Sequence, residues 1–202
     1  MRRRDVLAVV LASACFIGYP SARADTGQIE TFTFSESFDL PIPADPDASK
    51  GWMDPALIEV PEHLTILDLD VTVSVTHTKV FDLKLEIESP AGTRVLLNAP
   101  DPFQGYFDGE DYRGTTFDDE ADTPIEEGEP PFTGSFRPIG SNQLAAFDGE
   151  DAFGAWTLLI YDRFVVDTGR LDSVTLTFTA PEPATFALLL LGLPHLSWRR
   201  RH

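Results

Sequence analysis

The chain has 202 residues, of which 33 are acidic and 15 are basic, so its formal net charge at pH 7 is −18. A negative field of this size repels phosphate backbones, and the composition therefore excludes nucleic-acid binding. The single cysteine, Cys15, lies near the N-terminus, so no disulfide is expected in the rest of the chain.

The first 24 residues have the organisation of a secretory signal peptide. A basic start at residues 2–4 precedes an apolar segment at residues 6–19. Ala22 and Ala24 then form an A-x-A cleavage site. Cleavage after Ala24 would leave residues 25–180 as one exported domain, a length that is ample for a packed core.

Within this domain, apolar and polar side chains alternate with a period of two, which is typical of half-buried β-strands. The clearest segment is residues 67–77, where Leu, Val and finally His77 alternate with Asp, Ser and Thr. The same alternation recurs in four further segments, at residues 32–34, 81–88, 156–160 and 174–178.

Turn residues separate these predicted strands. Residues 89–92 read Ser-Pro-Ala-Gly and lie between residues 81–88 and 95–97, which predicts a β-hairpin. Helical spacing is hard to find outside the two chain ends. Short strands punctuated by Gly and Pro indicate an all-β protein, either an antiparallel sandwich or a barrel.

Three side chains invite a chemical interpretation, and each has a structural alternative. Trp156 lies on the apolar face of a predicted strand, which favours a core position over a ligand platform. His77 continues an inward-facing alternation, which favours a hydrogen-bonded structural histidine over a catalytic base. His63 has no partner motif, and no Gly-x-Ser-x-Gly or other nucleophile motif occurs. We therefore expect a protein without catalytic residues.

An acidic segment at residues 101–129 carries eleven carboxylates against one basic residue, Arg113. Oxygen ligands at this density suit Ca²⁺, which takes six to eight of them in irregular geometry. A solvated acidic face is the alternative. No EF-hand spacing is present, so the sequence alone does not define the ligands.

The C-terminal 22 residues form a motif of three parts. Pro181, Glu182 and Pro183 come first, an apolar run follows at residues 184–198, and the basic cluster is Arg199, Arg200 and Arg201. As a helix, this run of about fifteen residues would be about 23 Å long, less than the roughly 30 Å of a bilayer core. We expect a short transmembrane-type helix that associates with the membrane only transiently.

This tail resembles the PEP-CTERM sorting signal of Gram-negative bacteria, in which Pro-Glu-Pro precedes a short hydrophobic helix and an Arg cluster. The resemblance implies an exosortase as processing enzyme, and exosortases commonly accompany exopolysaccharide production. It also implies that the exported protein is sorted to the cell envelope, the cell surface or the extracellular matrix.

A second resemblance covers residues 71–178. Its motifs are, in chain order, Val-Thr-His-Thr at 75–78, Asp-Leu-Lys-Leu at 82–85, Ser-Pro-Ala-Gly-Thr at 89–93, Phe-Asp-Asp-Glu-Ala at 117–121, Phe-Thr-Gly-Ser-Phe-Arg-Pro at 132–138 and Gly-Ala-Trp-Thr-Leu at 154–158. Their order and spacing resemble the P domain, or Homo B domain, of kexin- and furin-type proprotein convertases. Phe136 stands where that family usually has Tyr.

The P-domain resemblance implies an eight-stranded antiparallel jelly-roll β-sandwich, with residues 28–66 adding strands at its start. Several bacterial P domains bind calcium near positions that match Asp82, Asp118 and Asp119, so we expect a structural calcium site at these three residues.

Two functions are consistent with these features. The first is a non-catalytic P-domain module at the cell surface or in the extracellular matrix, acting in binding or adhesion, with exopolysaccharide as a possible partner. The second is an accessory domain that serves proteolysis beside a serine endopeptidase of the subtilisin or kexin type on a separate chain.

Overall fold

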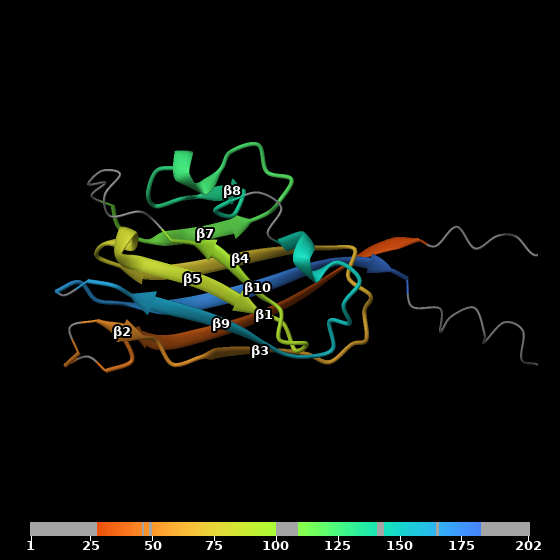
Figure 1. The fold of residues 1–202 in the computed structure, drawn as a ribbon, viewed down its shortest axis with the longest axis horizontal. Helices are drawn as coiled ribbons and strands as arrows, with labels where there is room; N and C mark the ends of the chain where they lie inside the picture. Colours follow the sequence, from red (N-terminus) through yellow and green to blue (C-terminus); the bar gives the residue numbers. More distant parts are fainter. Residues whose placement is uncertain are drawn as a thin grey trace, which may run out of the picture.

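A computed structural model describes residues 28–45, 47–48, 50–99, 109–140, 144–164 and 166–182. These ranges contain ten β-strands in two sheets (Figure 1). The strands are β1 (Ile29–Ile42), β2 (Gly51–Trp52), β3 (Ala56–Val60), β4 (Asp68–His77), β5 (Leu83–Glu88), β6 (Arg94–Asn98), β7 (Tyr112–Phe117), β8 (Gly134–Phe136), β9 (Gly154–Asp162) and β10 (Gly169–Pro181). Three short 3₁₀ helices connect them: η1 (Val80–Asp82), η2 (Ile125–Glu127) and η3 (Leu144–Phe147).

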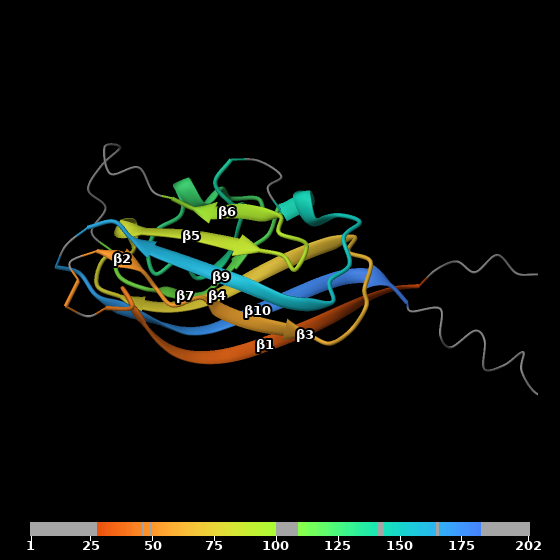
Figure 2. The same cartoon turned by 60° about the horizontal axis from the view of Figure 1, so that its bottom comes forward.

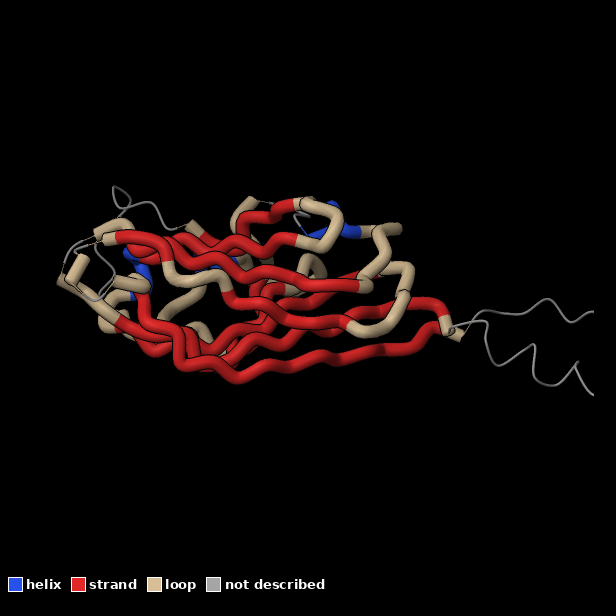
Figure 3. The backbone as a smooth tube through the Cα atoms, turned by 90° about the horizontal axis from the view of Figure 1, so that it is seen from below, coloured by secondary structure: helices blue, strands red, loops and turns tan. Residues whose placement is uncertain are grey.

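The two sheets pack face to face as a β-sandwich, which Figures 2 and 3 show from two further sides. Sheet A has the strand order β1-β10-β4-β7-β8. Sheet B has the order β2-β9-β5-β6, and β3 also pairs with β9. The predicted all-β sandwich is therefore confirmed, and the barrel alternative is wrong because the strands form two separate sheets.

Two details differ from the prediction. Strands β1, β2 and β3 lie within the expected additional segment at residues 28–66. Seven strands follow them in the described residues, whereas the resemblance implied eight. One strand pair, β7 with β8, is parallel, whereas every other recorded strand pair is antiparallel. A parallel pair needs a long connection, and here η2 and its flanking turns provide it.

Alternation explains why these segments become strands. In β4 the odd-numbered residues from Leu69 to His77 are buried, while the side chains between them are partly or fully exposed. Strands β9 and β10 show the same pattern. The pairing of β9 with β5 keeps one register, whereas the pairing of β10 with β4 shifts between Leu171 and Ser173, where the alternation is also interrupted. One face of each sheet thus points into the sandwich and the other into solvent, as the period of two predicted.

The predicted hairpin is also confirmed and joins β5 to β6. Ser89 donates its N–H to the Thr93 carbonyl (2.9 Å), and Gly92 donates to Ser89 (2.9 Å). Gly92 has a φ of 89°, a left-handed conformation in which glycine meets no Cβ penalty. The start of the predicted strand differs, because Phe81 belongs to η1 rather than to β5.

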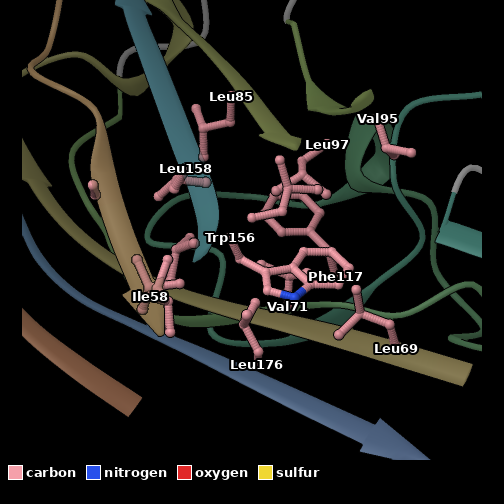
Figure 4. Close-up of a cluster of buried hydrophobic side chains, with 14 of the residues drawn as sticks. Ile58, Leu69, Val71, Leu85, Val95, Leu97, Phe117, Trp156, Leu158 and Leu176 are labelled. Atoms are coloured by element: carbon pink, nitrogen blue, oxygen red, sulfur yellow. The ribbon is translucent and has the colours of Figure 1, made fainter. Parts of the chain in front are cut away.

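The core lies between the two sheets and contains Trp156, which is completely buried (Figure 4). Its ring lies 5.0 Å from that of Phe147 and 5.3 Å from that of Phe178, measured between centroids. The indole Nε1–H donates to the Ala152 carbonyl at 2.9 Å. The predicted core position of Trp156 is therefore confirmed, with its polar atom satisfied as buried indoles require.

The strands account for nearly all of the regular structure. Among the described residues, no helix is long and apolar enough to cross a membrane. The predicted signal peptide with Ala22 and Ala24, and the tail from Pro183 through Arg199, Arg200 and Arg201, lie outside the described residues. Pro181 is the last residue of β10, and Glu182 donates its N–H to the Gln28 carbonyl at 2.7 Å.

Candidate functional site

The three aspartates predicted to bind calcium lie at opposite ends of β4. Asp82 ends η1, which follows the C-terminal end of β4. Asp118 and Asp119 follow β7, and the antiparallel pairing of β7 with β4 places the end of β7 beside the start of β4. The structure brings Asp118 and Asp119 together and does not bring Asp82 to them.

At the start of β4 lies a group of carboxylates that we call the acidic cluster: Asp68, Asp70, Asp118, Asp119, Glu120 and Asp148. Burial raises the pKa of Asp70 to about 7, and repulsion from Asp118, Asp68, Glu120 and Asp119 adds to the rise. The pKa values of Asp68, Glu120 and Asp148 are raised for the same two reasons. The cluster therefore favours partial protonation or a bound cation over full ionisation.

Local hydrogen bonds organise the cluster. Asp118 Oδ1 accepts from the Glu120 N–H at 2.7 Å, which holds the turn after β7. Asp119 Oδ2 accepts from the Ala145 N–H at 2.9 Å, whereas Asp119 Oδ1 is buried without a hydrogen-bond partner. The Asp119 carboxylate is thus held in place through one oxygen, while its other oxygen lacks a hydrogen-bond partner.

At the other end of β4, His77, Asp82 and Asp162 form a second, buried polar group. His77 Nδ1 accepts the Lys79 N–H at 3.0 Å, so a neutral ring carries its proton on Nε2. This Nε2 lies 3.5 Å from Asp162 Oδ2, and neither atom has a hydrogen-bond partner. Both side chains are completely buried, so His77 has the structural role that its alternation predicted.

Asp82 interacts electrostatically with Asp162 of this buried group. Burial raises the pKa of Asp82 to about 6, with Lys79 opposing the rise and Asp167 and Asp162 adding to it. Gly169 completes the packing, because a Cβ there would lie 2.2 Å from the Thr76 carbonyl oxygen and 2.5 Å from His77 Cδ2. Residue 169 therefore has a steric reason to be glycine.

Neither polar group forms a ready metal centre. Across the residues that the structure describes, no three Asp, Glu, His or Cys side chains converge closely enough to hold a metal ion. Residues 101–108 of the predicted acidic segment lie outside those residues. A calcium ion in the acidic cluster would therefore need backbone carbonyl and water ligands beside the carboxylates, both of which Ca²⁺ accepts.

The other histidine in the described ranges lies on the surface. His63 Nδ1 lies 2.7 Å from Asp151 Oδ2, and its ring stacks on Phe153 with centroids 4.2 Å apart. This hydrogen bond lowers the pKa of Asp151. The recorded hydrogen bonds of the two described histidine rings go to Asp151 and to the Lys79 N–H.

The outer face of sheet B carries a surface that the sequence analysis missed. We call it the sheet B surface, formed by Trp52, Leu57, Lys84, Glu86, Leu159 and Tyr161. Trp52 pairs with Tyr161 across β2 and β9, and their rings lie 5.0 Å apart. Lys84 Nζ lies 5.9 Å from the Trp52 ring and 2.8 Å from Glu86 Oε1. Alternation in residues 155–161 indicated which side chains point outward, but it did not show that Trp52 joins them.

Trp52 and Leu57 are 45% and 52% exposed, respectively, although both are large and apolar. Glu86 is largely buried, and its Oε2 has no hydrogen-bond partner, with Arg94 Nη1 3.9 Å away. An exposed tryptophan beside a partly exposed tyrosine and a lysine is typical of a binding surface.

Together, a two-sheet jelly roll with polar groups at both ends of β4 and an aromatic outer face defines the class of the protein as a β-sandwich module. The family model of the proprotein convertase P-domain matches residues 66–178, more than half of the chain. The chain therefore belongs to the P-domain family, whose members are the non-catalytic companions of subtilisin- and kexin-type catalytic domains.

The solved structures that are similar to this chain include two of one bacterial enzyme. One is the serine protease of Aeromonas sobria, at 20% sequence identity and a TM-score of 0.47, over 79% of this chain and 28% of that one. The other is the same protease in complex with the chaperone ORF2, at 21% identity and a TM-score of 0.47, over 77% of this chain and 28% of that one. The chain thus spans less than a third of their length. No curated protein sequence matches it.

Proposed function

We propose that this chain is an exported, non-catalytic P-domain module that is sorted to the cell surface or extracellular matrix and binds exopolysaccharide there. The membership of the P-domain family supports a non-catalytic role, and the two terminal sequence motifs support export and sorting by an exosortase-type enzyme. The observation that carries the binding part is the pair of exposed Trp52 and partly exposed Tyr161 on the sheet B surface.

The chemistry of the sheet B surface suits a sugar polymer. Sugar rings present C–H faces that pack on aromatic rings and hydroxyl groups that need donors and acceptors. Trp52 and Tyr161 offer the rings, the Tyr161 hydroxyl can donate or accept a hydrogen bond, and Lys84 offers a donor. Trp52 and Leu57 point outward on this face and are exposed, so a polymer that lies along the sheet can contact both.

The test is binding of the purified full chain to exopolysaccharide from its host, measured by isothermal titration. We expect Trp52→Ala to weaken binding by about tenfold, the effect of removing one aromatic anchor. Phe153→Ala is the matched control, because Phe153 is 47% exposed but lies outside the sheet B surface, and it should bind normally. Equal binding by Trp52→Ala and the unmodified chain would refute the proposal.

The second candidate function is that of an accessory domain for a serine endopeptidase carried on a separate chain. The family match favours it, because P domains accompany subtilisin-type catalytic domains. Cross-linking in the host, with a tag placed after Ala24, separates the two functions. Capture of surface polysaccharide supports the first, whereas a subtilisin-like protease in fixed proportion supports the second.

We also propose that calcium stabilises the module at the acidic cluster through Asp118 and Asp119. Mutual repulsion of the carboxylates and the unsatisfied Asp119 Oδ1 support this. Calcium should raise the melting temperature of the unmodified chain, and a chelator should reverse the rise. The double variant D118N/D119N should lose the response, while Asp82→Asn, at the far end of β4, should keep it. An unmodified chain whose melting temperature ignores calcium would disprove this part.

A further inference from the structure

Strand β1 is a long edge strand. It has 14 residues and lies at the end of the order of sheet A, along one margin of the sandwich (Figure 2). Within the described ranges, β10 is the one strand that pairs with it. The other edge strands, β2, β3, β6 and β8, have two, five, five and three residues. Natural sandwiches keep exposed edges short, so an open edge of this length needs an explanation.

The hydrogen-bond pattern shows which backbone groups of β1 point outward. Glu182 donates to the Gln28 carbonyl, so Gln28 and Glu182 form a hydrogen-bonded pair just before β1 begins. Bonded and non-bonded pairs alternate in an antiparallel ladder. Residues Glu30, Phe32 and Phe34 therefore bond to β10, whereas Thr31, Thr33 and Ser35 direct their N–H and C=O groups away from it.

A hydrogen bond on the other side of β10 supports this assignment of bonded and outward-pointing backbone groups. Thr179, the cross-strand partner of Thr31, accepts a hydrogen bond from the Leu67 N–H at 2.9 Å. Its carbonyl thus points towards β4 and away from Thr31. The outward groups of Thr31, Thr33 and Ser35 form a ready ladder for one more strand.

Side chains along this edge define the chemistry of the added strand. Phe32 and Phe34 face the core and pack against it, but they stay only partly buried at the margin. The Phe34 ring contacts the buried Phe178 ring, with centroids 6.0 Å apart. Glu30 and Glu36 flank them on the same side of the strand, and both are exposed. An added strand would cover the two rings with apolar side chains and meet a carboxylate on either side.

A second copy of this chain fits that pattern poorly. An antiparallel β1–β1 pair centred on Thr33 would place Phe32 opposite Phe34, but it would also place Glu30 opposite Glu36. Like charges directly opposite each other destabilise a strand pair. The net charge of −18 adds to the repulsion between copies.

We propose that the β1 edge binds an extended peptide segment of a partner protein as an added strand, with two alternate apolar residues facing Phe32 and Phe34 and basic residues facing Glu30 and Glu36. The backbone ladder supplies affinity, and the charges select a basic partner. This binding uses the margin of sheet A and is independent of the sheet B surface.

The probe is the peptide acetyl-Lys-Thr-Ile-Thr-Ile-Thr-Lys-amide, titrated into the purified full chain at low salt. We expect saturable binding and slowed hydrogen exchange at the amides of Thr31, Thr33 and Ser35. The peptide with Glu in place of both Lys residues should bind at least about tenfold more weakly because of like-charge repulsion. Equal binding of the two peptides would overturn the charge assignment, and no binding of the Lys peptide would overturn the proposal.

Two variants test the ladder itself. Thr33→Pro removes one outward N–H and leaves the bonds to β10 in place, and we expect it to weaken binding by about tenfold. Thr33→Val keeps the N–H and should bind the Lys peptide within about twofold of the unmodified chain. Should Thr33→Pro fail to fold, the Lys peptide N-methylated at its central Thr removes the matching donor on the ligand and should bind as weakly. Undiminished binding by this peptide would contradict strand addition.

Discussion

Asp70 is a residue whose charge the fold disfavours. Its half-buried carboxyl stands among the other acids of the acidic cluster, and its pKa rises from 3.8 to about 7. Below its unfolded pKa such an acid is protonated in both the folded and the unfolded chain, and its contribution to the stability of the fold is then fully present. That contribution is lost as the pH rises through 7. The free energy of unfolding should therefore fall as the pH rises from about 4 to about 7.

The substitution Asp70→Asn isolates this effect, because Asn resembles the protonated acid in shape and cannot ionise. At pH 8 we expect the variant to be more stable than the unmodified chain by about 1–2 kcal/mol, a value reduced for solvent screening of a half-buried group. At pH 4 the two should be nearly equal. Urea unfolding at both pH values measures the difference. Glu59→Gln, which removes an exposed carboxylate on β3, is the control and should change stability little at either pH.

At the level of the element, the β5–β6 hairpin depends on the left-handed conformation of Gly92. Its φ is 89°, and a Cβ there would meet no atom within 4 Å. The cost of Gly92→Ala is therefore conformational rather than steric, and we expect a loss of about 1 kcal/mol in the free energy of unfolding. Thermal and urea unfolding of the variant provide the measurement.

Gly51→Ala is the matched control for the hairpin. Gly51 has no left-handed φ, and a Cβ there would make an ordinary contact at 3.6 Å with Pro43 Cβ. This variant should be neutral or slightly stabilising, because alanine reduces the freedom of the unfolded chain. Equal losses in both variants would mean that the turn conformation of Gly92 is not what the hairpin depends on.

The elements differ in how far the sequence could predict them. Strands β4, β9 and β10 follow from local alternation, because each has one face in the core and one in solvent. The pairing of β1 with β10 joins residues about 140 positions apart, and no local pattern encodes it. The short, parallel β8 was missed for the same reason, since its three residues acquire strand geometry from β7.

The candidate sites show the same limit. Asp82 follows β4 in the chain, and Asp118 follows β7. Their placement at opposite ends of β4 results from the antiparallel pairing of β7 with β4, which the local motifs do not encode. Trp52 was missed because the two residues of β2 carry no periodicity, and their position beside Tyr161 comes from β9. Trp156 and His77 were predicted correctly, because each lies within a long alternating strand.

For the whole molecule, the strand register places the two ends of the described chain together. Ile29 pairs with Pro181, so the start of β1 and the end of β10 lie at the same end of the sandwich (Figure 1). The chain therefore continues from this one end both towards the predicted cleavage site at Ala24 and into the predicted sorting tail, which begins at Pro181. A membrane-tethered precursor would be held there, with η1 and the turn after β9 at the opposite end of the sandwich.

This geometry predicts that the tail acts on location and not on folding. Truncation after Glu182 keeps β10 and its bond to Gln28, so the truncated chain should unfold at the same temperature as the unmodified chain. In the host it should move from the cell-surface fraction to the medium, as cell fractionation and immunoblotting would show. Replacing Arg199, Arg200 and Arg201 with Gln should have the same effect, whereas replacing them with Lys keeps the charge and should preserve retention. Truncated chain that stays on the cell surface would mean that the module is held by its own binding surfaces, and the sorting hypothesis would then be wrong.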